Sequence, residues 1–280
     1  MSVANVDRSL AVLEVLAQHA RGLSLGALAT TLGIGKSALH RLLQTLAERG
    51  YVQQDALSQD YALSLKLALL GFRYLDAHHL PDVAQTALDR LAADSGEYVR
   101  IALVDGDTLA WVACAQGATA GLRYEPSMGR EVVLHATATG KAWLATLSDD
   151  EALARVRARG GFRVPAGFGP RVIRSAPVLR QELAATRRRG HALAIDEGEP
   201  GTTALAATFR GVDAPHAPVI GTVSIAGPTA RLDGPRVKAL VPRLAAATRE
   251  LTGLWPVWTR QHAPRHAGPA MRLDSTASSP

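Results

Sequence analysis

The chain has 280 residues, of which 47% are hydrophobic and 20% charged, so it can form about two domains of ordinary size and is not globally disordered. A single cysteine, Cys114, excludes an internal disulfide framework and an all-cysteine metal site, and its apolar surroundings favour a small buried residue over a reactive thiol. The net charge of +6 does not by itself indicate nucleic-acid binding, because residues 1–80 carry a balance of only +1.

No secretion signal and no apolar run of membrane-spanning length occur in the sequence. We therefore expect a soluble, cytoplasmic protein.

The first region, residues 1–63, is predicted to hold three helices and a hairpin. Apolar residues recur at helical spacing through VDRSLAVLEVLAQHA, which ends before Gly22. Ser24 is placed to cap a second helix that stops at Gly33, and Gly50 is placed to end a third. The expected elements are helices at residues 6–20, 25–32 and 35–49, and strands at residues 51–54 and 60–63.

Residues 64–79, SLKLALLGFRYLDAHH, are predicted to form a helix that is apolar almost all round. A short helix that avoids water on two faces is typically buried between two bodies. This pattern favours a linker helix that also pairs subunits. The alternative is a helix inside one large core.

Residues 80–256 are predicted to mix strands and helices. After a helix that opens at Pro81, two alternating runs are joined by Asp105-Gly106, which is a strong hairpin signal. Further helices are expected near residues 137–147, 149–159, 175–189 and 232–252, and strands at 191–195, 203–209 and 218–225. The pattern indicates an α+β fold in which helices flank a central antiparallel sheet. Residues 257–280 lack periodicity and are expected to form a disordered tail.

The third helix divides into two faces. At about 100° per residue, its leucines fall within one arc and its polar residues within another. The first arc holds Leu39, Leu42, Leu43 and Leu46, and the second holds Lys36, Ser37, His40, Arg41 and Gln44.

The polar face suits the major groove of DNA. Arginine and lysine donate to guanine, glutamine pairs with adenine, and serine meets a phosphate near a helix N-terminus. The preceding helix and the turn at Gly33 have the spacing of a helix-turn-helix motif, and the hairpin at 51–63 supplies a wing. The alternative is an ordinary amphipathic surface helix with a solvated polar face, and the pattern of this helix by itself does not exclude it. The turn and the wing together favour DNA binding.

Three segments of the sequence resemble one known family. LSLGALATTLGIGKSALHRLLQTLAERGYV is similar to the winged helix-turn-helix of IclR-type bacterial transcriptional regulators, LRYEPSMGREVVLHATATGKAWLATL to their effector-domain signature, and VSIAGPTARL to their closing strand. The likeness covers about residues 5–255. It implies a GAF-like C-terminal domain that binds a small organic acid or related metabolite.

The resemblance implies that Ala138, Thr139 and Ser224 line the effector pocket. Small residues at a loop-to-helix junction agree with this, because free backbone N–H groups there can hold an anion. The alternative is that these small residues only let a helix pack closely on a sheet. His135, in the same signature, is expected to cap a helix or fill the core.

Three alanines depart from the family pattern. Many relatives have an acidic residue and a cysteine where this chain has Ala194 and Ala204, and a second serine where it has Ala226. We expect a larger, less polar cavity and a bulkier effector than a two- or three-carbon keto acid.

The sequence thus predicts a DNA-binding regulator, more readily a repressor, that works as a dimer or a dimer of dimers on an operator. A protein-interaction module is a second hypothesis, and a small hydrolase or isomerase is a third. No catalytic motif, metal-ligand spacing or phosphate-binding glycine loop supports the enzyme. We expect no catalytic residues, no metal and no cofactor.

Overall fold

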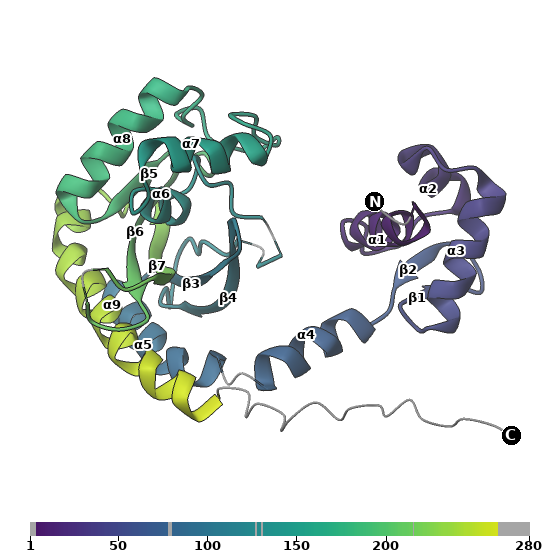
Figure 1. Ribbon diagram of the computed structural model, residues 1–280, viewed down its shortest axis with the longest axis horizontal. Coiled ribbons are helices and arrows are strands. Elements are labelled where there is room, and N and C mark those ends of the chain that lie inside the picture. The colour runs from purple at the N-terminus through teal and green to yellow at the C-terminus, as the bar shows by residue number, and fades with distance from the viewer. Residues whose placement is uncertain (1–3, 78–79, 127, 130, 215, 263–280) are drawn as a thin grey trace, which may run out of the picture. The chain divides into compact units, whose positions relative to one another are not determined.

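The computed structural model describes residues 4–262, apart from 78, 79, 127, 130 and 215. The chain divides into two compact units, one ending at residue 78 and the other beginning at residue 79 (Figure 1). Each unit is described by itself.

The N-terminal unit is a three-helix domain with a hairpin. Its elements are α1 (Ala4–Ala17), α2 (Leu25–Leu32), α3 (Lys36–Glu48), β1 (Val52–Gln54) and β2 (Tyr61–Leu63). The Ser24 hydroxyl accepts a hydrogen bond from the Ala27 N–H at 3.2 Å and so caps α2. Gly33 ends α2 in the left-handed conformation, with φ of 63°. The predicted bounds of α2 and the roles of both caps are confirmed.

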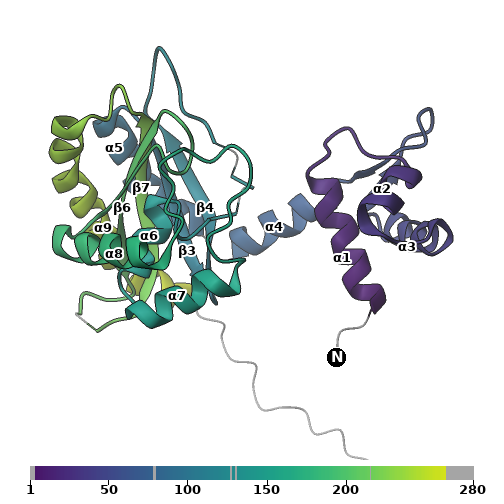
Figure 2. The same cartoon turned by 90° about the horizontal axis from the view of Figure 1, so that it is seen from above.

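One apolar core holds this unit together. The buried side chains come from all three helices and from both strands: Val12, Leu16, Leu28, Leu39, Leu43, Leu46, Val52 and Tyr61. The strands pair antiparallel, and Leu23 bridges Tyr61, which ties the hairpin to the segment before α2. Figure 2 shows α2 and α3 close together beside α1. Three of the four leucines predicted for the packing face of α3 are therefore buried in this core, whereas Leu42 is only half-buried and lies outside it.

Helix α4 (Lys66–Ala77) also belongs to the N-terminal unit. Several of its apolar side chains are exposed, including Leu69 at 54% and Phe72 at 68%. In the single chain α4 is therefore not enclosed in a large core, which was the alternative to a subunit-pairing helix.

The C-terminal unit is built on a five-stranded antiparallel sheet with the order β4-β3-β7-β6-β5. Its strands are β3 (Tyr98–Asp105), β4 (Thr108–Gln116), β5 (Ala192–Ile195), β6 (Thr202–Arg210) and β7 (Val219–Pro228). The turn after Asp105 joins β3 to β4 as predicted, and Gly106 adopts a φ of 56° there. The last strand of the sequence, β7, lies in the centre, so β3 and β6 are both its neighbours.

Helices cover both faces of this sheet (Figures 1 and 2). Helices α5 (Leu80–Ser95) and α9 (Gly234–His262) pack on one face through residues such as Leu88, Leu240 and Leu244. The other face carries α6 (Ala138–Leu144), α7 (Asp149–Ala158) and α8 (Ala176–Arg189). The predicted α+β fold, with helices flanking an antiparallel sheet, is confirmed.

The last helix is longer than the sequence indicated. It was expected to end near residue 252, yet α9 continues to His262. Part of its extension packs inward, because Trp255 lies 5.9 Å from the Phe209 ring between ring centroids. The predicted tail at 257–280 therefore begins inside α9, and residues 263–280 lie outside the described residues.

Candidate functional site

The first candidate site is the outward face of α3. Every polar side chain assigned to it is exposed: Lys36, Ser37, His40, Arg41 and Gln44. Within the part of the chain that the structure describes, none of these side chains makes a hydrogen bond or an ion pair. Their donors are thus available to an outside ligand.

The start of α3 is open. Its N-cap is Gly35, which provides no side-chain hydrogen bond, and a Cβ built at Gly35 would meet no atom within 4 Å. The first N–H groups of the helix therefore face free space near Ser37. This geometry suits contact with a phosphate oxygen.

The hairpin of β1 and β2 has a fixed tip. The Asp55 carboxylate accepts hydrogen bonds from the backbone N–H groups of Ser58 at 2.7 Å and Leu57 at 2.9 Å, and these bonds lower the pKa of Asp55. Residues 51–63 contain no lysine or arginine. Any contact of this wing with DNA must therefore use neutral donors such as Gln53.

The second candidate site is a cavity between the sheet and α6 in the C-terminal unit. Strands β3, β5, β6 and β7 and the start of α6 provide most of its wall. The open space is small, about 40 Å³. The three residues predicted for the effector, Ala138, Thr139 and Ser224, all line this cavity.

The start of α6 is less available to an anion than the sequence suggested. This helix has only seven residues, and its Gly140 N–H already donates to the Thr137 hydroxyl at 3.0 Å. Thr137 in turn donates to the Val133 carbonyl at 3.1 Å. The cap therefore occupies one of the backbone N–H groups at this junction, that of Gly140.

Sequence reasoning missed the only charged side chain on the wall of this cavity among the described residues. Arg100 comes from β3, where it pairs in register with Ser224 of β7. Its guanidinium lies 3.7 Å from the centroid of the Trp111 ring, and both residues line the cavity together with Tyr124. A lone cation inside the apolar run EYVRIALV was the available signal.

The presence of Arg100 shows that the expectation of a large apolar effector cavity is wrong. Ala194, Ala204 and Ala226 do line the cavity. They do not create a large apolar space, because Arg100 and Trp111 share the same wall and the open volume remains small. The cavity is thus compact and positively charged.

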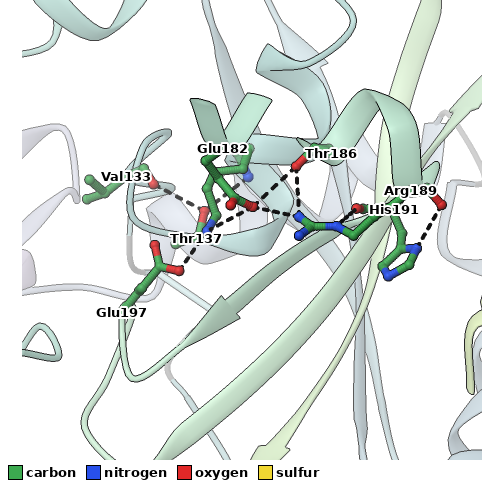
Figure 3. A network of polar contacts seen from close by, with 9 residues as sticks. Val133, Thr137, Glu182, Thr186, Arg189, His191 and Glu197 are labelled. Atoms are coloured by element: carbon green, nitrogen blue, oxygen red, sulfur yellow. Dashed lines mark hydrogen bonds and ion pairs between the residues drawn. The ribbon is translucent and has the colours of Figure 1, made fainter. Parts of the chain in front are cut away.

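A buried ion pair lies behind the cavity. Lys141 of α6 is fully buried, and its Nζ is 2.7 Å from Oε1 of Glu197 and 3.8 Å from Oε1 of Glu182. Figure 3 shows Glu182 and Glu197 reaching the same region from different segments, with Arg189 against Glu182. Burial raises the pKa of Glu197, and Lys141 opposes this only in part. This pair joins α6 to the segment after β5 next to the cavity wall.

His135 and Cys114, both singled out in the sequence, lie outside the wall of the cavity. His135 is buried and packs edge-on against Phe162, and burial lowers its pKa to about 4. This is the core role that was expected. Cys114 is half-buried on β4 rather than fully buried.

Comparisons with known proteins match both units of the chain. The family described as "Bacterial transcriptional regulator IclR C-terminal" matches residues 72–252, and the family described as "IclR helix-turn-helix domain" matches residues 5–56. The chain belongs to the IclR family of bacterial transcriptional regulators. It is accordingly a DNA-binding transcriptional regulator with a ligand-binding C-terminal domain.

Three relatives illustrate the range of this family. The glycerol operon regulatory protein of Streptomyces coelicolor is 32% identical over 89% of this chain and 93% of its own. The transcriptional repressor IclR of Escherichia coli is 28% identical over 89% of each chain. A solved IclR homologue from Microbacterium hydrocarbonoxydans, in complex with 4-hydroxybenzoate, has a TM-score of 0.70 at 20% identity and covers 90% of this chain and 99% of its own.

Among the described residues, no group of three or more His, Cys, Asp or Glu side chains is arranged to hold a metal ion. No described helix combines the length and the apolar character that crossing a membrane requires. The curated relatives are regulators and not enzymes.

Proposed function

We propose that this IclR-family regulator contacts its operator with the exposed face of α3 and responds to a small organic acid bound in the cavity beside α6. The observation that supports the first part is the availability of five polar side chains on a helix whose opposite face is buried. Arg41 and Lys36 are the base- or phosphate-contacting cations, and Gln44 and His40 are neutral donors beside them.

A footprint on promoter DNA tests this assignment. The full chain is added to DNA from the genes that flank its own, and protection is measured at several salt concentrations. We expect log K to fall linearly with log salt, with a slope of about −0.9 for each phosphate contacted. An affinity that does not change with salt would contradict a groove-bound α3.

The same titration separates DNA recognition from a protein-interaction role for the winged helix. A protein partner held by apolar contacts shows a weak salt dependence, because few counterions are released. A steep slope on a defined DNA fragment supports the operator role.

The effector part rests on the cavity. Its wall combines small apolar side chains with the hydroxyls of Thr139 and Ser224 and one cation. A structural relative binds 4-hydroxybenzoate, an aromatic acid, which supports an organic acid as the effector class. The effector can change operator affinity only if it binds two arrangements of the regulator with different affinity, and the size of that difference limits the change.

We also propose that the N-terminal units pair as a dimer. Helices α1, α3 and α4 border a groove of about 590 Å³, lined by apolar residues that include Leu10, Leu42 and Leu70. Leu10 is 52% exposed, and an apolar surface of this kind is uncommon on a monomer. A second copy is the proposed occupant of the groove, because a pair of recognition helices reads two half-sites one helical turn apart.

Sedimentation equilibrium tests the pairing. We expect Leu10→Glu to weaken self-association about tenfold or more, because it places a charge in an apolar interface. Leu57→Glu is the control, since Leu57 is 95% exposed at the wing tip and does not line the groove. Equal behaviour of the two variants would contradict the dimer face.

The family relatives support two further assignments. Several are named as repressors, so we propose repression as the mode of regulation. A regulator that acts on chromosomal DNA works in the cytoplasm, and we propose this location for the chain.

A further inference from the structure

The guanidinium of Arg100 has an unusual environment. Its Nε is shielded from solvent and has no hydrogen-bond partner, and in the described part of the chain no carboxylate forms an ion pair with it. Aromatic rings surround it, with Trp111 at 3.7 Å and Tyr98 at 5.6 Å from the guanidinium carbon to each ring centroid. A buried cation without an anion is unfavourable unless another group supplies the charge.

Arginine keeps its proton under these conditions. Burial lowers the pKa of Arg100, while Tyr124, Tyr98 and Glu199 act in the opposite direction. The guanidinium nevertheless stays charged at neutral pH, because an arginine side chain does not lose its proton in proteins under these conditions. The cavity therefore carries a full positive charge.

Another arginine shows what the chain does when a similar cation is structural. Arg155 lies over Trp143 at 5.0 Å, and its Nε is also buried without a partner. Its guanidinium forms an ion pair with Asp107, and Arg155 does not line the cavity. Arg100 has the aromatic support without an ion-paired carboxylate, and the favourable effect of Glu199 on its charge is smaller than the cost of burial.

We propose that Arg100 is the anchor that pairs with the carboxylate of the effector, and that the cavity selects acids with a single negative charge. The inference rests on the proposed function and deepens its effector part. A planar guanidinium that is held over a ring presents its remaining donors in a fixed plane, which matches a carboxylate.

The rest of the wall explains the limit to one charge. Arg100 is the only charged residue among the described residues that line the cavity, and Lys141 behind the wall is already paired with Glu197. A second carboxylate would lose its water without gaining a cation. Ala138, Ala194 and Ala204 offer apolar contact to the body of the acid.

The segment that contributes Tyr124 to the cavity wall is held in place by hydrogen bonds. Tyr124 lines the cavity, and its carbonyl accepts a hydrogen bond from the Gln116 side chain at 3.1 Å. The Leu122 carbonyl accepts another from Arg231 at 2.7 Å, and Arg231 is itself fixed by two contacts to Glu97. The backbone that carries Tyr124 is thus positioned by the fold.

Matched pairs of acids and amides test the proposal. The full chain is titrated by calorimetry with acetate, pyruvate, benzoate and 4-hydroxybenzoate, and with the amide of each, since the amide keeps the shape and removes the charge. We expect at least one acid to bind. The affinity of its amide should be lower by a factor of about 30 or more. Succinate is expected to bind more weakly than the best monocarboxylate.

Three variants locate the charge preference. Arg100→Met is expected to weaken the binding of the acid about 30-fold or more and to bring the acid and its amide to similar affinity. Arg100→Lys should keep the preference for the acid with reduced affinity. Arg155→Met, the matched control, should leave the affinity for the acid unchanged.

Several results would overturn the proposal. They are an amide that binds as tightly as its acid, an Arg100→Met variant with unchanged affinity for the acid, or no binding by any acid up to about 20 mM. If Arg100→Met does not fold, Arg100→Lys and the acid-to-amide ratio of the unaltered chain still decide the matter. A neutral compound that binds in the cavity and releases operator DNA would refute the role of Arg100 as a carboxylate anchor and leave the proposed regulatory function intact. Failure of the protein to bind any operator would refute only the proposed regulatory function.

Discussion

Replacement of Lys141 by methionine is the sharpest test of how the C-terminal unit is held together. The side chain of Lys141 is 1% exposed and that of Glu197 is 11% exposed, with 2.7 Å between Nζ and Oε1. The Lys141→Met variant keeps the length of the side chain and leaves Glu197 buried without its cation. Glu182 loses only its longer contact with Lys141 and keeps an ion pair with Arg189 at 2.7 Å, so Glu197 is the carboxylate left without a cation.

The expected loss follows from this geometry. Removing one partner of a buried ion pair costs about 3–5 kcal/mol, because the other charge is left without compensation. For a domain of this size each kcal/mol lowers the Tm by about 2–4 °C, so the Tm should fall by about 6–20 °C. The exposed pair Arg180–Asp150, at 3.4 Å, is the control, and Arg180→Met should cost at most about 1 kcal/mol.

The pH dependence gives an independent check. Without Lys141, burial raises the pKa of Glu197 in the folded state further above its value in the unfolded state. Because its folded-state pKa is raised, Glu197 costs no stability at low pH and costs more as the pH rises through its unfolded value. The deficit of Lys141→Met, measured by urea denaturation, should therefore be larger at pH 8 than at pH 5.

A double variant completes this test. Glu197→Gln removes the charge that Lys141→Met leaves unpaired, so the Lys141→Met/Glu197→Gln protein should recover most of the lost stability. If the single variant is as stable as Arg180→Met, or if the double variant is no more stable than Lys141→Met, the role assigned to this pair is wrong.

Two further predictions concern the same unit. The pKa of His135 is lowered to about 4, so the folded state should be about 3 kcal/mol less stable at pH 4 than above pH 6.5, and His135→Phe should remove this part of the pH dependence in denaturation curves. A Cβ on Gly140 would lie 2.3 Å from the Leu134 carbonyl oxygen, so Gly140→Ala should cost about 3 kcal/mol or more. Gly253→Ala, in open space on α9, should instead stabilise the protein by about 0.5–1 kcal/mol, and equal Tm values for the two would contradict the packing described.

The N-terminal unit was largely predictable from its sequence, because its signals are local. A glycine that ends α2 and a serine that caps it fix the helix bounds, and the leucine spacing of α3 fixes which side is buried. The exposure of α4 was not predictable from the pattern alone, because an apolar helix gives the same spacing whether its own chain or another chain covers it.

The cavity was only partly predictable. Ala138, Thr139 and Ser224 came from the family resemblance, and their meeting at one cavity depends on the sheet order that places β7 between β3 and β6. That order arises from long-range pairing, which strand periodicity does not contain. The apolar run around Arg100 marks it as unusual, but the cavity it faces follows only from its register opposite Ser224, which is again long-range pairing.

The most direct test of the central claim is operator affinity of variants on the exposed face of α3. On a footprinted operator, we expect Lys36→Ala and Arg41→Ala each to weaken binding by about 1–3 kcal/mol. On DNA altered at the base that Arg41 contacts, Arg41→Ala should cost less binding free energy than on the original operator. Arg188→Ala, which removes an exposed arginine from α8, should leave the affinity unchanged. Operator binding by both α3 variants that equals that of Arg188→Ala would contradict the claim that this face reads DNA.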